Sequence, residues 1–120
     1  MSFREKRLSL RVPLSIIVTY WVRQQERKEV YEVEAVNIGE GGIFIKTDIP
    51  MGIGTEIQLE FSLPPGGIKP LRISGQVVWS GEAEKGGKSV FGKGIRFTKC
   101  DEHCRKLLAE YIARYTKEHS

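Results

Sequence analysis

The chain has few of the residues from which reactive centres and disulfide frameworks are built. Its 120 residues include two cysteines, Cys100 and Cys104, and two histidines, His103 and His119. Two cysteines are too few for a disulfide framework, which indicates a reducing compartment. Both histidines lie near the C-terminus, so no Ser-His-Asp or Cys-His constellation can be assembled. We therefore expect no enzyme activity and no cofactor.

A metal site is not expected either. Cys100, His103 and Cys104 fall within about one helical turn, but a closed structural zinc site requires four ligands. The remaining histidine, His119, is almost at the end of the chain. Cys104 is interpreted instead as a core residue of a helix.

Long hydrophobic runs are also absent. The basic N-terminal stretch leads into no apolar segment of signal-peptide length, and no run is long enough to span a bilayer. We therefore expect a cytoplasmic protein without membrane insertion. A hydrophobic content of 40% in 120 residues, with no repeat or linker, fits one compact domain. The net charge of +4 is compatible with anionic partners but does not choose among them.

Alternation of apolar and polar residues dominates the chain from residue 14 onward and indicates half-buried antiparallel strands. We count six such runs, separated by turn-rich segments that include 39–42, 48–54 and 82–88. Gly75 interrupts one run and suggests a bend or bulge. Residues expected to face the interior include Val18, Tyr20, Ile57, Leu59, Phe61, Leu71, Ile73, Val77, Trp79, Phe91, Ile95 and Phe97.

The last segment changes period. Cys104, Leu108 and Ile112 recur at helical spacing, which predicts an amphipathic helix capped by Asp101 or Thr98. Six short strands and one helix favour an all-β fold, a six-stranded antiparallel barrel with a C-terminal amphipathic α-helix. The single domain, 1–120, then divides into a flexible N-terminal arm (1–12), the barrel (13–97) and the helix (98–118).

Two short motifs are each weak by themselves. REKRLSLRVPL, residues 4–14, contains Arg7 and Arg11 in an RxxxR spacing that any basic tail can contain. VNIGEGGIFI, residues 36–45, is not a Walker motif, because no Gly-Lys-Ser/Thr follows and a strand comes next. Alone, it predicts a hairpin with glycines at positive φ, and Asn37 predicts only a turn residue.

Read together and in this order, the two motifs resemble the PilZ domain, a bacterial receptor module for cyclic di-GMP. The family pattern is RxxxR followed, one strand pair later, by D/N-x-S-x-x-G, on a six-stranded barrel with a helical terminus. The closing segments GQVVW (75–79) and GIRF (94–97) also have the family's appearance. The resemblance covers nearly the whole chain.

The resemblance implies cyclic di-GMP as the ligand and a binding site made of Arg7, Arg11, Asn37, Gly39 and Gly42. Arginine can bind a phosphate bidentately, pair with a guanine edge or stack on a purine. Asn37 would meet a guanine edge with its amide, and Gly42 would permit a sharp turn and close ligand approach. The arm is expected to close over the ligand on the barrel surface.

The chain departs from the family pattern at Gly39, where the family has serine. Loss of one hydroxyl removes a hydrogen bond worth on the order of 1 kcal/mol, which weakens binding without abolishing it. We therefore expect a cyclic di-GMP receptor or adaptor that changes its conformation or a surface read by a downstream protein, which the sequence does not identify. Motility, surface attachment, exopolysaccharide production or development would be the regulated process. The alternative is a degenerate PilZ-like protein-interaction module that does not bind nucleotide.

Other partners are less well supported. Single-stranded nucleic acid would require rows of exposed aromatic side chains, whereas most aromatics here are in phase with the interior, so we expect no nucleic-acid binding. The oligomeric state stays open: the ligand can bind as one molecule or as a stacked pair, and a pair could recruit a second arm and form a homodimer.

Overall fold

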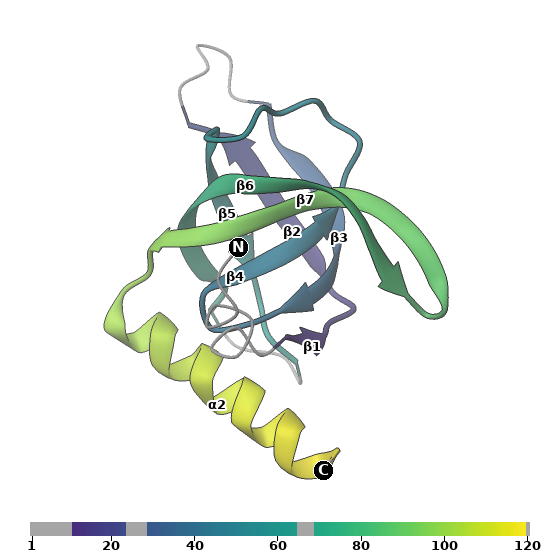
Figure 1. Ribbon diagram of the computed structural model, residues 1–120. Coiled ribbons are helices and arrows are strands. Elements are labelled where there is room, and N and C mark those ends of the chain that lie inside the picture. The colour runs from purple at the N-terminus through teal and green to yellow at the C-terminus, as the bar shows by residue number, and fades with distance from the viewer. Residues whose placement is uncertain (1–10, 24–28, 65–68, 120) are drawn as a thin grey trace.

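The computed structural model describes residues 11–23, 29–64 and 69–119; Arg7 and most of the predicted arm lie outside this part. The described chain forms strands that curve into a ring, with one helix across an end of it (Figure 1). The elements are β1 (Val12–Pro13), β2 (Ile17–Val22), β3 (Tyr31–Ile38), β4 (Gly42–Lys46), β5 (Glu56–Phe61), β6 (Leu71–Lys85), β7 (Lys88–Lys99) and α2 (Glu102–Glu118).

The strands close into an antiparallel barrel. Pairing runs β3-β2-β5-β6-β7-β4, and β4 pairs back onto β3, so β2 to β7 form a ring of six. The two-residue strand β1 pairs with the far end of β3, where Val12 lies opposite Ile38 and Pro13 opposite Asn37. The predicted six-stranded barrel with a C-terminal helix is confirmed. Closure pairs every strand along part of its length and so limits exposed sheet edges.

The barrel interior follows the alternation predicted from the sequence. Val18 and Tyr20 of β2, and Ile57, Leu59 and Phe61 of β5, are buried as expected. Tyr20 is fully buried, and its hydroxyl lies 3.0 Å from Oγ1 of Thr47, which is also buried. This hydrogen bond offsets the cost of removing both hydroxyls from water.

A β-bulge interrupts β3 at Val36. Ala35 pairs with Ile45 and Asn37 pairs with Phe44, so two steps along β3 correspond to one step along β4. Before the bulge the inward residues are odd-numbered; after it, Ile38 is fully buried. The extra residue therefore reverses the alternation and leaves Asn37 on the outer face.

The prediction that Trp79 faces the interior is wrong. Gly75 lies at a register shift in the β6–β7 pairing, as the sequence suggested, but a second shift lies between Val77 and Trp79. Val77 is fully buried, whereas Trp79 is 47% exposed. The second bulge turns the indole to the outside, because a one-residue change of phase moves a side chain to the opposite face.

Residues 82–88, predicted as a loop, instead belong to a long β6–β7 hairpin. Gly86 and Gly87 have φ values of 59° and 77°, which suit a tight two-residue turn between strands. The hairpin projects beyond the barrel (Figure 1), where its polar residues need no buried face. Phe91 lies on this projection and is 48% exposed, so its predicted inward position is also wrong.

The C-terminal helix packs as predicted, but it begins at Glu102 rather than at residue 98, because Thr98 and Lys99 still belong to β7. Oδ1 of Asp101 accepts a hydrogen bond from the backbone N–H of Cys104 at 2.8 Å, which identifies Asp101 as the N-cap. Cys104, Leu108 and Ile112 are buried in the core. Within the described residues, no helix is long and apolar enough to cross a membrane.

Gly92 provides a test of how closely β4 and β7 approach. A Cβ atom at this position would overlap the carbonyl oxygen of Ile45 and lie 2.8 Å from Cε1 of Phe44. We expect Gly92→Ala to lower the free energy of unfolding by about 1–3 kcal/mol, because the barrel must distort. Urea denaturation measures the change. Gly52→Ala, whose Cβ would meet nothing within 4 Å, is the matched control, and equal stability of the two variants would contradict the interpretation.

Candidate functional site

The described residues of the predicted site converge at the end of β3. Nη1 of Arg11, just before β1, donates a hydrogen bond to Oδ1 of Asn37 at 3.0 Å. The pairing of β1 with β3 brings Arg11 to this position, since Pro13 lies opposite Asn37. The Arg11 side chain is exposed, yet partial desolvation of its guanidinium lowers its pKa. The group stays cationic at neutral pH, because arginine starts from a very high value.

Gly42 lies beside this pair. A Cβ atom there would overlap the carbonyl oxygen of Ile95 and approach within 3.3 Å of Nη2 of Arg11. Gly42 is therefore required by the close pairing of β4 with β7, and it also leaves room for the guanidinium. The structure thus brings Arg11, Asn37 and Gly42 together; Arg7 lies outside the described residues.

The turn between β3 and β4 differs from the hairpin predicted from the motif alone. Gly39, Gly41 and Gly42 all lack positive φ, so conformational freedom in the left-handed region is not the reason for glycine here. The turn is held by backbone hydrogen bonds: the N–H of Gly39 donates to the Gly42 carbonyl at 2.8 Å, and the Gly41 carbonyl accepts from Phe97 at 2.8 Å. Gly39, at the position of the family serine, is buried.

The outer face next to Asn37 carries an aromatic pair that the sequence analysis missed. Across neighbouring strands, Asn37 pairs with Phe44, Phe44 with Gly94, and Gly94 with Trp79. The rings of Phe44 and Trp79 have centroids 5.3 Å apart. Asn37, Phe44 and Trp79 therefore lie in one row across β3, β4, β7 and β6.

Glycines form the surface beneath the indole of Trp79. A Cβ at Gly94 would lie 3.2 Å from Cβ of Trp79, and one at Gly81 would lie 2.9 Å from its Cζ2. The ring thus rests directly on the backbone of the sheet. Glycine in a strand often marks such a close approach. The glycines themselves were a signal in the sequence, since GKG (92–94) and VVWSG (77–81) contain three of them. The bulge that exposes Trp79 could not be predicted from the sequence.

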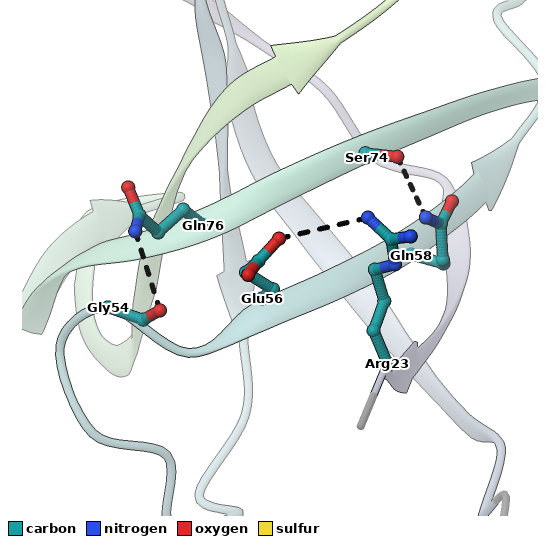
Figure 2. Close-up of polar contacts among 6 residues, drawn as sticks. All are labelled: Arg23, Gly54, Glu56, Gln58, Ser74 and Gln76. Atoms are coloured by element: carbon teal, nitrogen blue, oxygen red, sulfur yellow. Dashed lines mark hydrogen bonds and ion pairs between the residues drawn. The ribbon is translucent and has the colours of Figure 1, made fainter. Parts of the chain in front are cut away.

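A second arginine lies in the adjacent row of the same face. Gly42 pairs with Arg96, and Arg96 pairs with Gln76. Nη2 of Arg96 donates to Oε1 of Gln76 at 2.9 Å, and Nε2 of Gln76 donates to the Gly54 carbonyl at 3.4 Å (Figure 2). This hydrogen-bonded chain orients an exposed guanidinium one row from Asn37. In GKGIRF (92–97), Ile95 and Phe97 were expected to face inward, so the alternation of a strand would have placed Arg96 on the outer face.

Beyond Gln76 the outer face is polar and internally bonded. Glu56 of β5 lies 3.7 Å from Arg23, and Nε2 of Gln58 donates to Oγ of Ser74 at 2.7 Å. Figure 2 shows both pairs. These groups are bonded to one another, and the partly buried Trp21 of β2 lies opposite Gln58 on the same face. The combination of cations, amide and exposed ring is therefore concentrated around Arg11, Asn37, Trp79 and Arg96, which we call the arginine–tryptophan face. No group of three His, Cys, Asp or Glu side chains able to hold a metal ion occurs among the described residues.

The comparison with protein families agrees with this architecture. Residues 5–114 match the PilZ domain family. The chain belongs to the PilZ domain family. The match includes both motifs, so the resemblance inferred from them is confirmed. No curated protein matches the chain.

Two solved structures share the fold of this PilZ domain. The Bacillus subtilis inhibitor of motility (MotI/DgrA) is 16% identical with a TM-score of 0.72; the match covers 96% of this chain and 53% of that one. This chain thus spans about half the length of that protein. The PilZ domain of YcgR from Escherichia coli, solved with c-di-GMP, is 13% identical with a TM-score of 0.64 and coverage of 92% of both chains.

The position of Trp79 on its glycine surface can be tested by fluorescence. In a Trp21→Phe background, we expect Gly81→Ala to push the indole away from the sheet and to increase quenching of Trp79 emission by acrylamide. Gly41→Ala is the control, because its Cβ would meet nothing within 4 Å. Unchanged quenching in Gly81→Ala would show that the ring does not rest on Gly81 in solution.

Proposed function

We propose that this PilZ domain binds cyclic di-GMP on the arginine–tryptophan face. The observation that carries the proposal is the Arg11–Asn37 hydrogen bond, which presents a cation and an amide on the same outer face as the exposed indole of Trp79, in the row that runs through Phe44 and Gly94. Cyclic di-GMP has two phosphates and two guanines, so it requires both charge and flat apolar surface. Membership of the PilZ family and the YcgR domain solved with c-di-GMP support the same ligand.

Each group on the face has a chemical role in this proposal. Arg11 binds a phosphate or the O6/N7 edge of a guanine with its planar fork of donors. Asn37 uses its Nδ2 donors, for which no described residue is an acceptor, while Oδ1 holds Arg11. Trp79 offers a ring face for purine stacking. Arg7 belongs to the same site by analogy with the family, with Gly39 and Gly42 forming its turn.

The proposed role is that of a receptor or adaptor. Binding of the nucleotide by Arg7 and Arg11 changes the surface around β1 and the β3–β4 turn, and another protein reads that change. A hollow lies between this turn and the start of α2. It is lined by Glu40 and Gly41 of the turn, Phe97 of β7 and Arg105 of α2. Motility, attachment, exopolysaccharide production and development are the processes such a receptor would regulate.

Arginine substitutions test the proposal directly. We expect Arg11→Ala and Arg7→Ala each to weaken cyclic di-GMP binding about 10- to 100-fold, because each removes charge-assisted hydrogen bonds worth about 1.5–3 kcal/mol. Isothermal titration calorimetry measures the dissociation constant. Arg114→Ala is the matched control, since it removes the same charge from an exposed position on α2. Equal weakening by Arg114→Ala would show that the loss of affinity comes from the lower net charge of the protein and not from a contact in the site.

Gly39 provides a gain-of-function test. Its φ is not in the left-handed region, so serine meets no backbone strain there. We expect Gly39→Ser to tighten binding several-fold, because the restored hydroxyl adds a hydrogen bond of about 1 kcal/mol. Equal or weaker affinity in the same titration would show that residue 39 does not contribute to the site in this way.

The second candidate function is a PilZ-like interaction module that does not bind nucleotide. The observation that favours it is glycine in place of serine at residue 39. The titration separates the two: absence of heat at high ligand concentration, with unchanged amide spectra around Asn37, would support the interaction module. Saturable binding that depends on Arg11 would support the receptor.

A further inference from the structure

The β6–β7 hairpin carries a second surface, away from the arginine–tryptophan face. Pairing of β7 with β4 ends at Gly92, and pairing of β6 with β5 ends at Gln76, so the two strands of the outer part of the hairpin pair only with each other. Its end is anchored to the barrel by Lys85, whose Nζ donates to the Ala35 carbonyl at 2.8 Å and lies 3.6 Å from Oε2 of Glu34. The hairpin is thus fixed against β3.

An open groove lies between this hairpin and the barrel wall. Phe91 contributes from the hairpin, Ile17 and Glu32 from β2 and β3, and Asp48 from the segment after β4. Ile17 is 58% exposed and Phe91 48% exposed, which are large values for such side chains. Exposed apolar side chains that line one groove with polar groups at its border are typical of an interaction surface.

Phe91 is held in its exposed position by polar contacts rather than by the core. Nζ of Lys93 lies 5.0 Å from the centroid of the Phe91 ring and donates to Oγ of Ser80 at 2.8 Å. Lys93 is only 6% exposed. A buried ammonium group under an aromatic ring orients that ring by a cation–π interaction, so less side-chain entropy is lost when a partner covers it.

The charges of the groove are unbalanced. Glu34 is already paired with Lys46 at 4.0 Å and with Lys85. Glu32 and Asp48 are exposed and form no ion pair with any described residue. A chain with a net charge of +4 therefore presents, in this groove, two carboxylates that no described cation pairs with, beside two exposed apolar side chains. Complementary potential favours a cationic partner and disfavours nucleic acid or an anionic membrane.

We propose that this hairpin groove docks a segment of another protein in which basic side chains flank a bulky apolar residue. The apolar residue contacts Phe91 and Ile17, and the basic residues pair with Glu32 and Asp48. The residues that line the groove are separate from those of the arginine–tryptophan face, so this interaction does not depend on the function proposed above.

A short synthetic peptide tests the chemistry without knowledge of the natural partner. The probe is an acetylated, amidated octapeptide that alternates lysine with leucine, and two matched peptides replace every lysine with glutamate or every leucine with serine. Binding is followed by amide chemical shifts of the full-length protein. We expect only the lysine–leucine peptide to bind with saturation, with shifts concentrated at Ile17, Glu32, Asp48 and Phe91.

Protein variants then test the residues. We expect Glu32→Lys and Phe91→Ser each to weaken binding of the lysine–leucine peptide at least about fivefold, whereas Glu110→Lys, the same charge reversal on an exposed part of α2, leaves it unchanged. Each variant is first compared with the parent by circular dichroism and thermal unfolding. We expect both to keep the fold, because Phe91 and Glu32 are exposed. Asp48→Asn provides a second, smaller charge change if either variant fails to fold.

The proposal would be overturned by absence of saturable binding, by equal binding of the glutamate peptide, or by shifts located away from the groove. Concentration-dependent shifts at the groove in the protein alone would also overturn it, because they would identify a second copy of this chain as the occupant.

Discussion

The β-bulge at Val36 is the constraint on which the candidate site depends. Without it, continuous alternation from Tyr31 would point Asn37 into the core and leave Ile38 outside. With it, Ile38 fills the barrel, and Asn37 meets Arg11 on the surface. The same irregularity lies next to the Ala35 carbonyl that accepts from Lys85, so the end of the long hairpin is fixed beside it. One inserted residue thus positions both surfaces of the domain.

Much of the fold was readable from the sequence, because burial on one face imposes period two on each strand. Ile57, Leu59 and Phe61 show this, and Asp101 was one of the two helix caps predicted from residue type and position. The predictions failed where a strand changes phase: Trp79 follows a bulge, and Phe91 lies on a hairpin outside the barrel. A bulge is a property of two paired strands, and the pattern of LRISGQVVW (71–79) alone did not reveal the one before Trp79.

The site was readable in part for a related reason. Arg11 and Asn37 belong to motifs, and their convergence follows from the strand pairing that the motifs accompany. Trp79 and Arg96 are part of neither binding motif. They join the face only because β7 pairs with β4, and β6 with β7, in the closed barrel. In YEVEAVNI the shift of apolar residues from odd to even positions is visible, and it could have located the bulge before Asn37.

Closure of the barrel also has a consequence for the order of folding. The β6–β7 and β3–β4 hairpins join neighbouring segments, whereas β4–β7 pairing joins segments far apart in the chain and carries a larger loop-closure entropy. The row from Asn37 to Trp79 crosses that β4–β7 seam. The arginine–tryptophan face therefore exists only after these non-local contacts have formed, and a chain that has both hairpins but an open seam has its core strands without this face.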